Sequence, residues 1–218
     1  MTNSPDMPFR IGVDLGGTKT EAVALDGSGQ IVARQRVASP QGDYQATVLN
    51  IRDLVHAIEA EAGGMGSVGV AIPGTISPAS GLVKNANSTW LIGYALDKDL
   101  GSVLGRPVRL ANDANCFALS EAVDGAVQGM DVVFGVIIGT GVGGGLVVGN
   151  RAITGPNAIA GEWGHNPLPW PDESEWPGEP CFCGQRGCLE TFVSGTGMTR
   201  DHESVNGRKL SAEEIVAG

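Results

Sequence analysis

A strand–turn–strand pattern rich in glycine occurs twice in this chain, and it constrains the fold more than any other feature. The first copy runs from FRIGVDLGG (9–17) through the alternating segment TEAVAL (20–25) and the turn DGSG (26–29) to QIVARQRVA (30–38). The second copy, 132–153, has the same order, and its FGVIIGTG aligns with IGVDLGGT almost position for position. Alternation and glycine turns predict β-hairpins, and two copies suggest two related lobes. Chance similarity between two glycine-rich hairpins is the alternative.

The segments between the two copies carry helical and strand patterns. Residues 46–62, ATVLNIRDLVHAIEAEA, place apolar residues at helical spacing and stop at a glycine pair, which predicts an amphipathic helix. SVGVAIPG (67–74) predicts a short buried strand, and VRLANDANCFALSEAV (108–123) predicts a strand that leads into a helix through NDAN. The 218 residues are therefore expected to form an α/β protein, as one large domain or two smaller lobes.

Composition and charge argue against several classes of function. The formal net charge of −10 is unsuited to nucleic acid, whose partners need a basic face, and to an anionic membrane surface. The polar start MTNSPDMP does not resemble a signal peptide, and no stretch approaches the ~20 apolar residues of a membrane span. We expect a cytoplasmic protein whose thiols are kept reduced. The 34 glycines, roughly double the usual ~7% share, indicate tight turns and close approach of backbone to a ligand.

Three of the four cysteines fall within CFCGQRGC (181–188). A disulfide or a metal could draw them together, and reduced cysteines in a turn are the third possibility. Zinc prefers four soft or borderline ligands in a tetrahedron. The candidate for the fourth ligand is His165, in GEWGHNP, because His56 lies on the earlier helix and His202 lies beyond the cluster. The predicted structural zinc site consists of His165, Cys181, Cys183 and Cys188.

A metal at this place would also fix the residues beside its ligands. Glu162 and Glu190 lie near His165 and Cys188, so zinc would aim two carboxylates, which suits a site for a polar ligand. Surface carboxylates are the alternative for each of them. Cys116 stands apart, within an apolar helical pattern, and is expected to be an unreactive core residue.

The two glycine turns are candidate phosphate sites. DLGGTKT (14–20) offers consecutive backbone N–H groups to an anion, with Thr and Lys beside them, and IGTGVGGG (138–145) repeats the arrangement. The first turn has neither the P-loop pattern nor the dinucleotide-binding fingerprint, and it is followed by a strand where those motifs require a helix. Asp14, at the end of the first strand, would suit a Mg²⁺ ion held through water.

Asn112 and Asp113 stand at a predicted junction between a strand and a helix. Asx residues at such a junction are usually N-caps. In a chain with two phosphate turns, an Asp between two lobes is also a candidate general base for a substrate hydroxyl. Both interpretations are open at this point.

These motifs together resemble those of the ROK family of sugar kinases, within the actin-like ATPase superfamily. The motifs are, in order, DLGGTKT, GVAIPG, LANDAN, IIGTGVGGG, GEWGH and CFCGQRGCLE, and they span residues 11 to about 195. The resemblance implies an α/β, two-lobe actin-like (ribonuclease H-like) fold, with residues 1–120 in the first lobe and 121–218 in the second. It also implies ATP and sugar in the cleft between the lobes, with Mg²⁺ and a structural Zn²⁺ as cofactors.

The resemblance further implies roles for single residues. Asp113 would be the catalytic base, accepting the proton of the sugar hydroxyl while Mg²⁺ and loop amides offset charge on the phosphoryl oxygens. His165 would face zinc through one ring nitrogen and sugar through the other. The residues expected to bind sugar are Asn112, Glu162, His165, Glu190, Gly74 and Asn87. The residues expected to hold phosphate and Mg²⁺ are Asp14, Gly16, Gly17, Thr18, Lys19, Gly139, Thr140 and Gly141.

The expected reaction is transfer of the ATP γ-phosphoryl group to the 6-hydroxyl of a hexose. KNANSTWLIGYALDKDL (84–100) and GEWGHNPLPW (161–170) look most like the bacterial fructokinases and mannokinases of the family, which favours fructose. ANCFALSEA and GTGVGGG look equally like its N-acetylglucosamine kinases. An N-acetylglucosamine kinase or a glucokinase is therefore the alternative within the family.

The end of the sequence departs from the family pattern. It stops at AEEIVAG, inside an early helix of the second lobe, so we expect an incomplete lobe that leaves apolar surface uncovered. VSGTGM (193–198) resembles the start of a helix just after the cysteines. If the chain is not a fragment of a longer enzyme, it lacks the adenine side of the cleft and is expected to bind sugar weakly and to phosphorylate it poorly or not at all. It is expected to self-associate, as a homo-oligomer (dimer), or to need the remainder of the chain to cover that apolar surface.

Two functions from other classes compete with the kinase. The family includes sugar-responsive repressors, but these carry a DNA-binding helix-turn-helix ahead of the first phosphate strand, which here begins near Phe9. The other competitor is a non-catalytic sugar-binding or regulatory protein. The partners expected are a small-molecule sugar and ATP, with no nucleic acid and no membrane.

Overall fold

The fold is taken from a computed structural model, which describes residues 7–218. The chain divides into two compact units, each described here by itself. The first extends to Cys116 and includes Pro156–Ala158, and the second comprises Phe117–Gly155 and Ile159–Gly218. The lobe boundary that the sequence predicts after residue 120 stays a prediction; that position lies within helix α3, Asp113–Val123.

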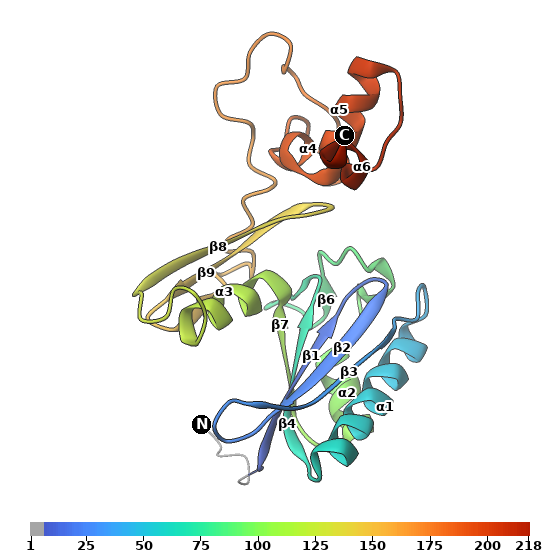
Figure 1. Cartoon of the computed structure of the whole chain (residues 1–218), viewed down its shortest axis with the longest axis vertical. Coiled ribbons are helices and arrows are strands. Elements are labelled where there is room, and N and C mark those ends of the chain that lie inside the picture. Colours follow the sequence, from blue (N-terminus) through green and yellow to red (C-terminus); the bar gives the residue numbers. More distant parts are fainter. Residues whose placement is uncertain (1–6) are drawn as a thin grey trace. The chain divides into compact units, whose positions relative to one another are not determined.

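The first unit is built on a five-stranded sheet with the order β3-β2-β1-β4-β7 (Figure 1). The first three strands form the predicted antiparallel meander, and β4 and β7 run parallel to β1. The strands are β1 Phe9–Leu15, β2 Lys19–Leu25, β3 Ile31–Ala38, β4 Gly66–Ile72 and β7 Val108–Asn112. The hairpin, the buried strand and the strand leading into a helix are thus confirmed.

Helices α1 (Tyr44–Ala62) and α2 (Leu96–Leu104) cover one face of this sheet (Figure 1). Local signals set the ends of α1: the Asp43 side chain accepts a hydrogen bond from the Ala46 amide at 2.9 Å, and Gly63 ends the helix in the left-handed region. Alternate strand residues and the apolar stripe of α1 form one core. The shorter elements, which the sequence analysis did not predict, are β5 Thr75–Ile76, β6 Val83–Lys84, the 3-10 helix Thr89–Leu91 and α2.

The second unit contains the second copy of the hairpin. Strands β8 (Val132–Ile138), β9 (Val142–Val148) and β10 (Arg151–Ile153) form an antiparallel sheet in the order β10-β9-β8. Helix α3 packs on one face through Ala118 and Ala122. The remaining elements are α4 Glu190–Val193, α5 Gly195–Asn206, which begins within the predicted segment, and α6 Ala212–Ala217.

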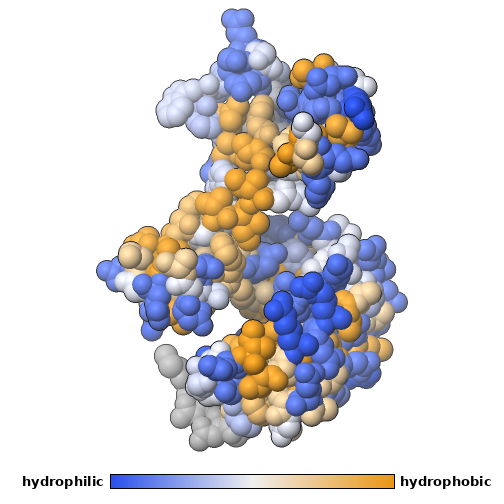
Figure 2. All heavy atoms as spheres, viewed as in Figure 1, coloured by the Kyte–Doolittle hydropathy of each residue, from blue (hydrophilic) through white to orange (hydrophobic). Residues whose placement is uncertain are grey.

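The other face of β8 is exposed, which confirms the expected uncovered apolar surface. Val132 is 64% exposed, Phe134 49%, Val136 45% and Ile138 57%, and these alternate residues point to the same side of the strand. Hydrophobic residues also gather over this strand pair in Figure 2. The homo-oligomer expected from such a surface stays a prediction. Within residues 7–218, no helix is both long enough and apolar enough to traverse a lipid bilayer.

Candidate functional site

The candidate residues of the first unit meet at the carboxyl ends of its parallel strands. Asp14 on β1 pairs in register with Ala71 on β4, and Ile72 pairs with Asn112 at the end of β7. The first glycine turn, the Pro73–Gly74 turn and the start of α3 therefore lie along one edge of the sheet. In open α/β sheets, this edge is the usual place of a ligand site.

Asn112 caps the start of α3, and Asp113 is held beside it as the first residue of the helix. Asn112 Oδ1 accepts a hydrogen bond from the Asn115 amide at 3.1 Å, so the N-cap interpretation is correct for Asn112. The Asn112 Nδ2 donates to Asp113 Oδ1 at 3.1 Å, and the Ala114 amide donates to the same oxygen at 2.8 Å. One oxygen of Asp113 is thereby held in place while its side chain remains accessible. Capping thus orients the carboxylate that the sequence predicts as catalytic base.

Electrostatics favours the neutral form of Asp113 more than in a free aspartate. Desolvation by burial raises its pKa, and the nearby charge of Asp14 raises it further, against the hydrogen bond from Ala114. The Cys116 thiol has a raised pKa for the same reasons, burial first and then the charges of Asp113 and Asp14. Cys116 is half-buried, not the core residue that the sequence predicts. It lies near both carboxylates, and its i+3 spacing from Asp113 on a helix could have indicated the first of these contacts.

The first glycine turn has its carbonyl groups occupied by the segment after β3. The Ser39 hydroxyl donates to the Gly16 carbonyl at 2.8 Å, the Ser39 amide to the Thr18 carbonyl at 3.0 Å, and Gln41 Nε2 to the Gly17 carbonyl at 3.3 Å. Carbonyl oxygens would repel a phosphate, so fixing them elsewhere suits a turn that binds an anion through its amides. Lys19, also expected here, begins β2 and is exposed.

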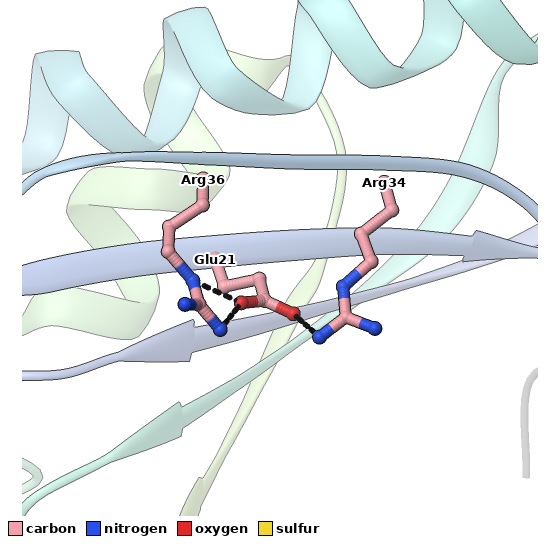
Figure 3. Close-up of polar contacts among 3 residues, drawn as sticks. All are labelled: Glu21, Arg34 and Arg36. Atoms are coloured by element: carbon pink, nitrogen blue, oxygen red, sulfur yellow. Dashed lines mark hydrogen bonds and ion pairs between the residues drawn. The ribbon is translucent and has the colours of Figure 1, made fainter.

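Asp14 has charged neighbours on the same face of the sheet, which the sequence analysis missed. Asp14 pairs with Glu21 between β1 and β2, and Glu21 pairs with Arg36 between β2 and β3. Figure 3 shows the Glu21 carboxylate between two arginines: Arg34 Nη2 lies 2.5 Å from Oε1, and Arg36 binds Oε2. Burial and the Glu21 charge raise the pKa of Asp14, and Arg36 opposes them. Period-2 alternation along β2 and β3 could have revealed this row.

Gly74 and Asn87 also lie together in the first unit. The Asn87 amide donates to the Pro73 carbonyl at 3.2 Å, beside Gly74, and Asn87 is exposed. A Cβ on Gly74 would lie 2.9 Å from the Cβ of Ala86, so no side chain fits there. Glycine at this position is required by packing, whether or not it also approaches a ligand.

In the second unit, the second glycine turn is held by the segment that follows the cysteines. The Gly139 carbonyl accepts from the Gly195 amide at 2.7 Å, and the Thr140 carbonyl from the Thr196 hydroxyl at 2.9 Å. Glu190 Oε2 accepts a hydrogen bond from the Val142 amide at 2.9 Å. One oxygen of Glu190, predicted as a sugar ligand, is therefore already bound to the protein backbone.

The predicted metal ligands His165, Cys181, Cys183 and Cys188 converge, with one ligand atom from each lying within 4.8 Å of the others. Cys181 Sγ is 3.4 Å from His165 Nδ1, and the Sγ atoms of Cys183 and Cys188 are 3.6 Å apart. A tetrahedral zinc ion with Zn–S bonds of about 2.3 Å and Zn–N bonds of about 2.0 Å places its ligand atoms about 3.5–3.8 Å apart. The set fits zinc, and all four cysteines are free of disulfides.

The thiol chemistry also fits a cation. Burial first, and then the neighbouring thiols Cys183 and Cys181, raise the pKa of Cys188 to about 12. A divalent cation would remove this penalty, because it stabilises thiolates directly. His165 turns Nδ1 to the cluster and packs edge-on against Phe182 with ring centroids 4.9 Å apart, which leaves Nε2 as the nitrogen for another partner.

The metal loop, residues 181–188, is joined to the segment around His165 through backbone contacts. Pro167 and Cys188 form an isolated bridge, the Leu189 amide donates to the Asn166 carbonyl at 2.8 Å, and the Glu190 amide donates to the Gly164 carbonyl at 2.8 Å. Glu162, the other predicted carboxylate, is exposed, and its amide donates to the Ile159 carbonyl at 3.2 Å.

Comparison with known families and sequences shows which proteins are related to this chain. The model of the ROK family matches residues 10–218. The chain is 40% identical over 210 residues to the N-acetyl-D-glucosamine kinase of Yersinia enterocolitica, spanning 94% of this chain and 69% of that protein. The fructose preference expected from the sequence finds no support in that relative.

Solved structures of known sugar kinases share the fold, including the following two. The ROK hexokinase from Thermus thermophilus has a TM-score of 0.80 at 31% identity, with 95% of this chain and 67% of that one covered. A ROK family glucokinase from Streptomyces griseus, in complex with glucose and AMPPNP, has a TM-score of 0.74 at 31% identity, with 91% and 62% covered. The predicted actin-like α/β fold is confirmed by this likeness. The chain belongs to the ROK family.

Proposed function

We propose that this protein is an ATP-dependent hexose kinase that transfers the γ-phosphoryl group to the 6-hydroxyl of N-acetylglucosamine. The observation that carries the proposal is the relationship to proteins named N-acetyl-D-glucosamine kinase at 40–41% identity over 94% of the chain. The residues ANCFALSEA and GTGVGGG support the same substrate. Asp113, oriented at the start of α3, supports the chemistry.

In the proposed mechanism, Asp113 accepts the proton of the sugar hydroxyl as that oxygen attacks the γ-phosphorus. The Asn112 amide group and the Ala114 amide hold one carboxylate oxygen, so the other is available to the hydroxyl. Its raised pKa makes the ionised carboxylate a stronger base, since basicity follows pKa. The hydroxyl oxygen forms the new bond to phosphorus, and the bond to the ADP oxygen breaks.

The two glycine turns are assigned to the phosphates. In the first turn, the Gly17 and Thr18 amides and the Lys19 cation would bind one phosphate group, beside Gly16, whose amide donates to the Lys19 carbonyl at 3.0 Å. In the second turn, the Thr140 and Gly141 amides would offer the second set, beside Gly139, whose amide donates to the Gly141 carbonyl at 2.9 Å. The exposed Asp14 carboxylate fits a hydrated Mg²⁺, which when bound neutralises charge on the phosphoryl oxygens.

The sugar contacts are assigned to the polar groups that the sequence motifs indicate. Asn87 and Glu162 are exposed, and His165 keeps its Nε2 for a hydroxyl. Glu190 has one oxygen bound to Val142 and offers the other. Asn112 and the Gly74 backbone complete the set. Zinc is assigned a structural role, holding His165 and the three thiolates in place.

Fructose is the second candidate substrate. The residues that favour it are KNANSTWLIGYALDKDL (84–100) and GEWGHNPLPW (161–170), which resemble the fructokinases of the family. Most of the assigned contacts would serve any hexose, so the choice depends on the shape around the C2 substituent.

A coupled ADP-release assay tests the proposal. N-Acetylglucosamine, N-acetylmannosamine, fructose, mannose and glucose would be compared at equal concentration, with Asp113→Asn as the inactive control. The highest kcat/KM is expected with N-acetylglucosamine. A higher value with fructose would transfer the assignment to the second candidate. Sugar binding by calorimetry without ADP release from any hexose would favour a non-catalytic sugar-binding protein.

A further inference from the structure

We infer that Glu190, Gly195 and Thr196 position the second glycine turn, residues 139–142, so that the segment after the cysteines sets the shape of a phosphate-binding turn. The positioning role depends only on hydrogen bonds within the second unit. The consequence for nucleotide binding rests on the proposed function, in which this turn holds phosphate.

Three groups from residues 190–196, the anchoring segment, form hydrogen bonds with the turn. The Gly195 amide and the Thr196 hydroxyl donate to the carbonyls of Gly139 and Thr140 at 2.7 and 2.9 Å. The Glu190 carboxylate accepts from the Val142 amide at 2.9 Å. Within the turn, the Gly139 amide donates to the Gly141 carbonyl at 2.9 Å. The backbone of the turn is therefore held on both sides of its tip by residues outside the hairpin.

The first glycine turn shows the same arrangement at matching positions. Gly16 aligns with Gly139 and Gly17 with Thr140. The carbonyls of Gly16 and Gly17 accept from Ser39 and Gln41, just as those of Gly139 and Thr140 accept from Gly195 and Thr196. In the first copy, the anchors follow directly after β3. In the second copy they come from a segment about forty residues beyond β10, which no hairpin pattern reveals.

The anchoring segment is itself tied to the metal loop. The Glu190 amide donates to the Gly164 carbonyl at 2.8 Å, next to His165, and Glu190 begins α4 two residues after Cys188. The Ser194 hydroxyl caps α5 by accepting from the Gly197 amide at 3.0 Å, and it lies 2.9 Å from the Thr196 hydroxyl. The position of Thr196 is thus fixed by a helix start.

Thr196 provides the cleanest test, because it has no assigned contact with sugar or nucleotide. Thr196→Val removes the hydroxyl at nearly constant volume, and Thr196→Ser retains it. Amide hydrogen exchange of residues 139–142 should be about fivefold faster in Thr196→Val than in the parent, which is the loss of one neutral hydrogen bond. Thr196→Ser should restore the parent rate, and the first turn, residues 16–19, should be unchanged in both variants.

The outcomes separate the two claims. Unchanged exchange at residues 139–142 in Thr196→Val, or faster exchange confined to α5, overturns the positioning role. The nucleotide claim is read from MgADP affinity by calorimetry, where Thr196→Val is expected to weaken binding about fivefold and Thr196→Ser less than twofold. Faster exchange with unchanged MgADP affinity supports positioning and shows that the proposed phosphate role of this turn is wrong.

Discussion

A Cβ atom on Gly141 would lie 2.5 Å from Oε2 of Glu190, the oxygen that accepts the Val142 amide at 2.9 Å. Gly141→Ala should therefore displace the carboxylate and break that hydrogen bond. We expect exchange of the Val142 amide to become about tenfold faster, since a hydrogen bond to a charged group contributes about 1.5 kcal/mol or more. Gly143→Ala is the matched control, because nothing lies within 4 Å of a Cβ there. Equal effects of the two substitutions would contradict the steric argument.

The metal loop should bind a single Zn²⁺ ion per chain, measured by elemental analysis of protein purified without chelator. Cys183→Ser should lose the metal, because serine is a poor zinc ligand, whereas Cys116→Ser should keep it, because Cys116 belongs to the other unit. Chelation should remove zinc together with sugar binding and loosen residues 139–142, with α1 as the unaffected internal control. Protein free of zinc that still binds sugar would contradict the structural role.

Asp113→Asn should abolish most of the chemistry while preserving the fold and sugar affinity. An amide can still accept hydrogen bonds from Asn112 and Ala114, but it cannot take a proton from the sugar. Turnover should fall about 10²–10⁴-fold, the usual contribution of a general base. Asp53→Asn, on the exposed side of α1, is the control. Near-normal turnover in Asp113→Asn would make this residue only part of the helix cap.

The pH dependence of turnover should show the raised pKa of Asp113. The base is active when ionised, so kcat should fall as pH decreases through a value above the usual ~3.9 of aspartate. Asp14→Asn removes one of the charges that raise this pKa, so its acidic limb should move to lower pH even though its activity is reduced. Burial is the larger cause and remains in the variant. A limb that stays in place would show that Asp14 does not act on Asp113.

The pair of Arg106 and Glu59 should be important for stability in the first unit. Its side chains are 6% and 11% exposed, and Arg106 Nη2 lies 2.5 Å from Glu59 Oε1, which also accepts from the Gly66 amide at 3.0 Å. Arg106→Met leaves a buried carboxylate without its cation, which costs about 3–5 kcal/mol. Arg52→Met, which breaks an exposed pair with Asp53, should cost below about 1 kcal/mol. Urea unfolding would measure the free energy of unfolding of each variant against the parent protein.

Local patterns in the sequence determined most of the elements and the metal set. The glycine pair that ends α1, the apolar stripe of this helix and the glycine turns of both hairpins act over a few residues, so they could be read directly. The start of α1 at its Asp43 cap came from the structure. The zinc ligands were identifiable because three lie within eight residues and few histidines are available. The order of motifs was specific enough to identify the family.

Only the tertiary structure decided how residues distant in sequence act on one another. The pairing of β4 and β7 beside β1 brings Asp14 near Asp113, and the charge of Asp14 adds to burial in raising the pKa of Asp113. The contact of Glu190 with Val142 spans 48 positions, and that of Thr196 with Thr140 spans 56. No local propensity encodes such contacts, because they arise when separately formed elements pack together. The preferred sugar belongs to the same class of question: it depends on the shape around one substituent, which neighbouring residues in the sequence do not define.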